Sequence, residues 1–109
     1  MKLGVLAFCI MGPAVLLSPA SAQVTTGDPR QGQALAQEWC SSCHVIGPQQ
    51  PRAGNDAVPS FASIAHMSST TATSLKAFLE TPHPPMPDLK LSRAQIDDIV
   101  AYILSLRGH

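Results

Sequence analysis

Three residues in the first half of the chain have the types and the spacing that attach a redox cofactor. Cys40 and Cys43 are separated by two serines, and His44 follows directly. Cys-x-x-Cys-His is the attachment pattern for c-type haem. Each thiol can form a thioether with one of the two porphyrin vinyl groups, and the adjacent imidazole is then placed under the ring. The pattern predicts one haem c per chain, attached through Cys40 and Cys43, with His44 as the proximal iron ligand.

Two other kinds of site share part of this pattern. A redox-active dithiol needs only Cys-x-x-Cys, but it usually lies near a βαβ pattern, and the chain has none. A structural zinc site needs four ligands, typically with a second cysteine or histidine pair at close spacing. His66 and His83 are too far apart in sequence to form such a pair. Haem attachment is therefore favoured over both alternatives.

A haem iron can take a second axial ligand from a distant segment. The candidates are two methionines and three histidines: Met67, Met86, His66, His83 and His109. Met86 is favoured, because Pro85 and Pro87 stiffen its backbone and because an exposed methionine in a polar loop is otherwise hard to explain. His83 lies in the same loop and is the main rival. Met67 is expected to pack in the core, and His66 and His109 are expected to be ordinary polar residues.

The helix that leads into the motif is predicted to begin at Pro29. Asp28 is a suitable N-cap, and Gln31 would complete a capping box. One face of this helix carries apolar or small residues at helical spacing: Gly32, Leu35, Ala36 and Trp39. Glycine is a poor helix former, so Gly32 on the buried face predicts that another helix crosses very close to it.

Three further helices are predicted after the motif, and no segment has the alternating pattern of a strand. Ser60 caps a short helix that runs through Met67, with Phe61 and Ile64 inward, and a second helix spans 71–80. The buried stripe of this second helix is expected to hold Ala72, Leu75, Phe78 and Leu79. Pro82 ends it, and the proline-rich segment 83–87 must be an extended, stiff loop.

The last helix is expected over 93–107, with Ser92 and Gln95 forming a capping box and Gly108 acting as the C-cap. Its apolar stripe holds Ile96, Ile99, Val100, Ile103 and Leu104. The fold class is therefore all-α, with long loops.

The first 22 residues are interpreted as a secretory signal peptide. Lys2 precedes an apolar stretch, and Ala20, Ser21 and Ala22 fit the small-residue cleavage rule. An uncleaved membrane anchor is the alternative. Cleavage after Ala22 would leave residues 23–109 as one exported domain, and the expected location is the periplasm. A domain this small often needs a cofactor, a metal or disulfides for stability, and the haem would meet that need.

The composition excludes several classes of protein. The 109 residues are 45% hydrophobic and carry no net charge with histidine neutral. A disordered chain would have low hydrophobicity and high net charge. A nucleic-acid-binding protein would have a basic excess, whereas the pI is about 6.9. No nucleic-acid partner is therefore expected, and no stable membrane span should remain after cleavage.

The motif, the helices and the proline-flanked methionine together resemble the class I cytochromes c over residues 28–107. The resemblance implies the cytochrome c fold, in which the N- and C-terminal helices cross and loops wrap around the haem. It matches Gly32 and Tyr102 to the small and aromatic residues at that crossing. It also matches Pro59 to the proline whose carbonyl accepts a hydrogen bond from Nδ1 of the haem histidine, which would make Pro59 part of the cofactor site.

The function that the resemblance implies is one-electron transfer with His44 and Met86 as axial ligands, without enzymatic activity. The partners would be a redox donor and an acceptor, and the chain a monomer or a subunit. A dedicated electron-transfer subunit of a periplasmic dehydrogenase or oxidoreductase complex is the alternative. A sensor or weak peroxidase with five-coordinate haem is a further one. The lysine-rich docking face of the mitochondrial proteins is missing. Either the partners differ, or docking uses an apolar patch around an exposed haem edge with little electrostatic steering.

Overall fold

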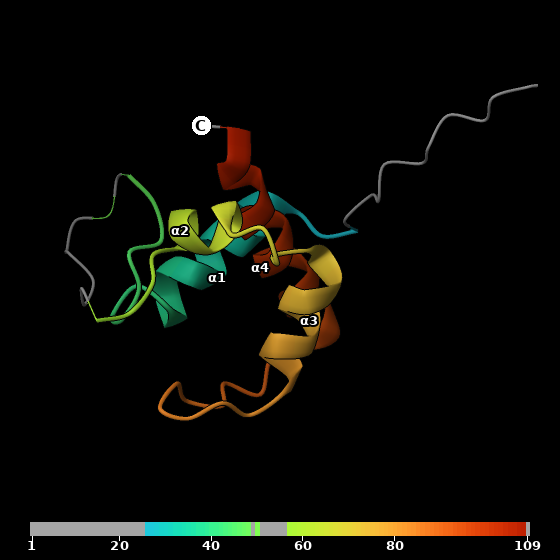
Figure 1. Cartoon of the computed structure of the whole chain (residues 1–109). Helices are drawn as coiled ribbons and strands as arrows, with labels where there is room; N and C mark the ends of the chain where they lie inside the picture. Colours follow the sequence, from blue (N-terminus) through green and yellow to red (C-terminus); the bar gives the residue numbers. More distant parts are fainter. Residues whose placement is uncertain (1–25, 49, 51–56, 109) are drawn as a thin grey trace, which may run out of the picture.

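The structure is a computed structural model that describes residues 26–48, 50 and 57–108. The predicted signal peptide and its cleavage site lie outside these residues. Four α-helices follow one another in the chain: α1 (Pro29–Trp39), α2 (Phe61–His66), α3 (Ala72–Glu80) and α4 (Arg93–Ser105), with a short 3-10 turn η1 (Leu106–Gly108) at the end (Figure 1). The described residues contain no strand, which confirms the all-α class.

Helix α1 begins where the sequence predicts, but its first turn is capped differently. The Asp28 side chain accepts a hydrogen bond from the backbone N–H of Arg30 at 2.8 Å. The predicted return bond from Gln31 to the backbone N–H of Asp28 is replaced by a bond from α4, since that N–H donates to Asp98 Oδ1 at 2.8 Å. The start of α1 is therefore tied directly to α4.

Helices α1 and α4 cross at Gly32, and this is the most extensive contact between elements in the described structure. A Cβ built on Gly32 would overlap the backbone carbonyl of Asp98 and would lie 2.9 Å from the Tyr102 Cβ. The absence of a side chain is what allows this approach. The crossing of the two helices at Gly32 and Tyr102 is confirmed.

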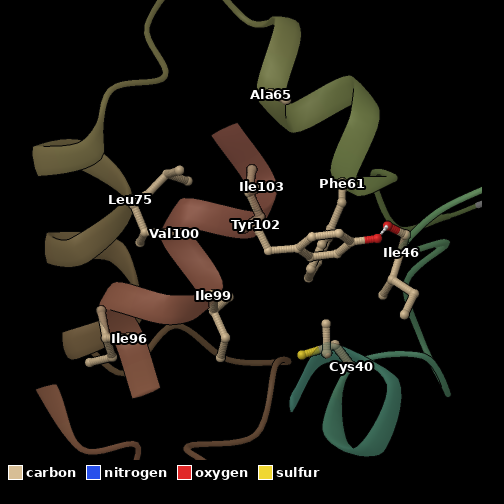
Figure 2. Packing of buried hydrophobic residues seen from close by; sticks show 11 residues of the cluster. Cys40, Ile46, Phe61, Ala65, Leu75, Ile96, Ile99, Val100, Tyr102 and Ile103 are labelled. Carbon is tan, nitrogen blue, oxygen red and sulfur yellow. Dashed lines mark hydrogen bonds between the residues drawn. The ribbon is translucent and has the colours of Figure 1, made fainter. Parts of the chain in front are cut away.

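The hydrophobic core lies between α4 and the other helices. Ile99 and Val100 are fully buried, and Figure 2 shows residues of the core from several elements gathered around α4. From α4 the Tyr102 ring points toward Ile46, and its hydroxyl donates to the Ile46 carbonyl at 2.9 Å. Phe61 packs beside Tyr102, with 6.3 Å between the ring centroids. The loop after the Cys-x-x-Cys-His motif is thereby joined to the core.

The Ser60 and Ser92 caps agree with the sequence, whereas Thr71, which was expected within the helix over 71–80, is the N-cap of α3. The Ser60 side chain caps α2, and Ser92 caps α4 with the predicted capping box to Gln95. The C-terminal end of α4 differs from the prediction. The helix ends with Leu106 as C-cap and tightens into η1, so Gly108 is not the C-cap.

Two apolar residues that were expected to be buried are exposed. Phe78 is 53% exposed, because it faces the loop after α3 and not α4. Met67 is 50% exposed. It is the C-cap of α2, and its extended backbone conformation carries the side chain away from the buried face of that helix. Among the described helices, none has the length and apolar character of a membrane span.

Candidate functional site

The Cys-x-x-Cys-His segment forms a tight turn that continues from the end of α1. The backbone N–H of Cys40 donates to Ala36 at 2.9 Å, and the N–H groups of Cys43 and His44 both donate to the Cys40 carbonyl, at 3.1 and 2.8 Å. This turn holds the two thiols and the imidazole close together within one compact segment of five residues. It also places the thiols in different surroundings, since Cys40 is buried and Cys43 is exposed.

Burial also changes the acidity of the Cys40 thiol. Cys40 is 7% exposed, and its side chain belongs to the core cluster (Figure 2). Burial raises the pKa of the Cys40 thiol to about 11, and the neighbouring Cys43 adds to the increase. A thiol in an apolar environment stays protonated at neutral pH. This arrangement is unlike a redox dithiol, whose attacking cysteine needs a lowered pKa.

The His44 imidazole is held by a residue far along the chain. Its Nδ1 lies 2.7 Å from the Pro59 carbonyl oxygen. Because a carbonyl only accepts, Nδ1 must carry the hydrogen, and in the neutral ring Nε2 keeps a free lone pair. The Phe61 ring lies beside the imidazole, with 5.4 Å between centroids. This is the contact predicted for Pro59, and it leaves Nε2 of His44 able to bind a metal.

Gln50 fastens the turn, although the sequence did not single it out. Its side-chain oxygen accepts from the Ile46 backbone N–H at 2.6 Å, and its side-chain nitrogen donates to the carbonyls of Ser41 and His44 at 3.0 and 3.1 Å. One amide side chain therefore satisfies three backbone groups around the motif. A glutamine in a loop rich in proline and glycine has no sequence signal that would separate it from its neighbours.

Met86 lies on a separate segment, the loop between α3 and α4. In Figure 1 this loop is the long orange segment on the side of the helices away from α2. The loop was predicted to be extended, but it turns at Pro84 and Pro85. The turn brings the Met86 sulfur to 3.0 Å from Nε2 of His83. Both side chains are partly buried.

The predicted site residues thus form two groups. Cys40, Cys43, His44 and Pro59 are joined by direct contacts around the turn after α1, whereas Met86 is placed with His83. The remaining candidates lie elsewhere: His66 and Met67 are exposed at the end of α2, and His109 is outside the described residues.

The donor atoms fit a c-type haem. Two free thiols are available for thioethers, the imidazole beside them has a free Nε2, and a soft thioether is carried by another loop. A zinc site would need a cluster of protein ligands, and no group of three or more His, Cys, Asp or Glu side chains within 26–48, 50 and 57–108 could hold a metal ion.

Comparison with known proteins identifies similar chains. Residues 27–103 match the family described as "Cytochrome C oxidase, cbb3-type, subunit III". A protein called cytochrome c-552 from Bradyrhizobium diazoefficiens is 44% identical over 91 residues, which cover 84% of this chain and 86% of that relative. No solved structure matches the chain.

Proposed function

The chain belongs to this family of c-type cytochromes, electron-carrying proteins with covalently bound haem, and on that premise we propose how its own residues hold the cofactor. Cys40 and Cys43 would form the two thioethers, and His44 and Met86 would be the two protein ligands of the iron. Bound in this way, the haem supplies an iron that cycles between the ferric and the ferrous state. The electron carrier has no separate enzymatic activity in this proposal.

The observation that supports the proposal most directly is the fastening of His44. The hydrogen bond from Nδ1 to the Pro59 carbonyl, 2.7 Å long, selects the tautomer whose Nε2 can ligate iron. It also makes the imidazole a better electron donor to the metal. Pro59 therefore acts on the cofactor through His44. The hydrogen bonds from Gln50 to the same turn hold the thiols and the imidazole in fixed positions relative to one another.

A carrier benefits from a site that changes little between oxidation states. The turn at 40–44 is held by backbone bonds and Gln50, and the Met86 loop is stiffened by the prolines on both sides of the methionine. Two protein ligands leave no iron position for a substrate. A thioether with an imidazole raises the reduction potential relative to more strongly donating ligands. The proposed ligand set therefore suits reversible one-electron transfer.

We propose that the mature protein consists of residues 23–109 and acts in the periplasm. The basis is the apolar stretch that follows Lys2 and the small residues at 20–22. The redox partners would then be a donor and an acceptor in that compartment. Mass spectrometry of the exported protein tests the cleavage: an N-terminus at Gln23 is expected, and retention of residues 1–22 would contradict it.

The test of the ligands is the visible absorption spectrum of the holoprotein, oxidised and then reduced. A low-spin c-type spectrum is expected, with the weak red band that marks a methionine–ferric iron bond. The band should disappear in Met86→Leu and persist in Met67→Leu, the matched control. A high-spin spectrum in the wild-type protein would favour a five-coordinate sensor or peroxidase. A red band unaffected by Met86→Leu would remove Met86 from the site.

A second candidate is a dedicated electron-transfer subunit. The family description names an oxidase subunit, and that name supports an arrangement in which this domain is held against one enzyme. Affinity purification from the native membrane and periplasmic fractions distinguishes the two. A stoichiometric enzyme partner would favour the subunit, and a free monomer that exchanges electrons with several proteins would favour the carrier.

A further inference from the structure

The loop that carries Met86 also carries a second potential iron ligand, His83, close to the Met86 sulfur. Nε2 of His83 lies 3.0 Å from the Met86 sulfur. Two atoms this close cannot both ligate one iron from the same side. Because only 3.0 Å separates them, replacing one donor atom by the other needs a displacement of about that distance.

One form of the His83 ring, the neutral tautomer with its hydrogen on Nδ1, leaves Nε2 with a free lone pair. Nδ1 of His83 lies 2.6 Å from the Thr81 carbonyl oxygen, which can only accept a hydrogen bond. The hydrogen is therefore on Nδ1, and in the neutral ring the lone pair is on Nε2. A ring N–H donated to a backbone carbonyl is the usual arrangement of a metal-binding histidine. His44 has the same arrangement with Pro59.

The orientation of the His83 ring is also held from one face. The Phe78 ring lies against it, with 3.8 Å between centroids and 35° between planes. The stacking and the Thr81 bond together restrict rotation of the imidazole, so that Nε2 stays directed toward the Met86 sulfur. Phe78 has a role in the structure that its place on the apolar stripe of α3 did not suggest.

We propose that His83 is an alternative axial ligand, which binds the haem iron through Nε2 when the Met86 sulfur does not. The inference rests on the proposed ligation by His44 and Met86. In the exchange one sulfur–iron bond breaks and one nitrogen–iron bond forms. No electron is transferred, and the ligating form is the neutral ring that keeps its hydrogen on Nδ1 beside the Thr81 carbonyl. A state with two histidine ligands has a lower reduction potential than one with histidine and methionine, so the loop provides two low-spin states of different potential.

The experiment uses the holoprotein with Met86→Leu, which keeps the size of the side chain and removes the donor sulfur. The ferric protein should lose the red methionine band yet stay low-spin, with the electron paramagnetic resonance signature of two imidazoles. Its reduction potential should be lower than that of the wild type. Met86→Leu with His83→Ala should become high-spin and bind carbon monoxide rapidly when reduced.

The matched control is Met86→Leu with His66→Ala. His66 also places Nδ1 near a backbone carbonyl, that of Ala62 at 2.8 Å, but it lies on α2. This variant should remain low-spin. A high-spin Met86→Leu protein would overturn the inference, and so would a low-spin spectrum that survives His83→Ala. Met86→Ala is compared in the same way if the leucine variant does not retain haem.

The wild-type spectrum separates this inference from the proposed function. A red methionine band in the wild type together with a high-spin Met86→Leu protein would leave the proposed ligation intact and refute only the role of His83. A wild-type protein without the band would instead refute ligation by Met86.

Discussion

Both backbone groups of Ile46 are satisfied by side chains from elsewhere in the chain. Its N–H donates to Gln50 and its carbonyl accepts from the Tyr102 hydroxyl, which comes from α4. These two bonds lie directly after the Cys-x-x-Cys-His motif. At the scale of single residues, the segment proposed to hold the cofactor is therefore fixed by two side chains that are not themselves proposed to bind it.

Gln50→Ala should destabilise the folded protein. The substitution removes three hydrogen bonds to backbone groups, and at roughly 0.5–1.5 kcal/mol each the expected loss is about 1.5–4.5 kcal/mol. Denaturant unfolding of the holoprotein measures it. The control is Gln33→Ala, an exposed position on α1, which should change stability by less than about 0.5 kcal/mol. Equal unfolding midpoints for the two variants would contradict the role of Gln50.

Tyr102→Phe should also be destabilising, because it leaves the buried Ile46 carbonyl without its donor. The expected loss is about 1–2 kcal/mol near neutral pH, measured by denaturant unfolding. A variant as stable as the wild type would mean that water or a rearranged donor satisfies that carbonyl.

The same residue should make stability depend on alkaline pH. Burial raises the pKa of the Tyr102 hydroxyl above its ordinary value of 10.0. A raised pKa in the folded state means that the folded protein binds the proton more tightly. The stabilisation is complete below about pH 10 and is lost as the pH rises through the folded pKa. The free energy of unfolding should fall more steeply above pH 10 in the wild type than in Tyr102→Phe, and parallel curves would contradict this.

At the scale of elements, α4 is the helix that the others contact. It crosses α1 at Gly32, and Lys76 of α3 forms an ion pair with Asp97 at 2.6 Å. Beyond its end, Arg107 donates to the carbonyls of Ala65 and Thr70 around the end of α2. The positions of α1, α2 and α3, and of the loops between them, therefore depend on α4.

Gly32→Ala should force α1 and α4 apart, since the new Cβ would overlap the Asp98 backbone, which cannot move as a flexible side chain could. The expected destabilisation is about 1–3 kcal/mol or more, despite the better helix propensity of alanine. Gly108→Ala is the matched control, because a Cβ at Gly108 would meet nothing within 4 Å. Thermal unfolding followed by circular dichroism compares them, and equal midpoints would contradict the close crossing.

Asp97→Asn should weaken the attachment of α3 to α4 in a pH-dependent way. The hydrogen bond from Lys76 holds the pKa of the Asp97 carboxyl below its usual value of 3.8. A lowered folded pKa gives stability that is present above the ordinary pKa and is lost as the pH falls through the folded value. Between about pH 5 and pH 2 the wild type should lose more stability than the variant. Lys76→Gln should likewise reduce the dependence of the unfolding free energy on pH in this range. An unchanged dependence in both variants would contradict the ion pair.

At the scale of the whole molecule, the core is small and the proposed cofactor site lies at its edge. Cys40 and Phe61 belong to the core cluster, yet each also adjoins the residues proposed to bind haem. A domain of this size buries a limited share of its unfolded surface. A covalently bound apolar ring would therefore add a large part of the buried surface.

Removal of the haem should cost the protein its cooperative fold. In Cys40→Ala, Cys43→Ala the thioethers cannot form, and the protein is expected to be poorly helical at 25 °C, as small domains without their cofactor often are. Far-ultraviolet circular dichroism during heating measures this, with Ser41→Ala, Ser42→Ala as a control that keeps both thiols. A stable helical protein with a sharp unfolding transition would contradict the expectation.

Several features follow from the sequence alone because they depend on neighbours along the chain. The Cys40–His44 spacing predicts the cofactor, since covalent attachment needs only adjacent residues. Caps such as Ser92 with Gln95 act within one turn, and the structure has them where the sequence predicts. Gly32 indicates the helix crossing, because glycine disfavours a helix and is expected on a buried helix face where a side chain would block the neighbouring helix.

The tertiary structure decided the contacts between distant segments. The Asp28 N–H donates to Asp98 and not to Gln31. The Gln50 side chain holds the turn that carries the motif. The turn at 84–85 places His83 beside Met86. Each of these depends on how loops and helices meet, and many polar residues could have served equally well. Local chemistry in the sequence therefore determined which cofactor this chain binds and where its helices begin, whereas long-range packing decided which side chains hold that cofactor site in shape.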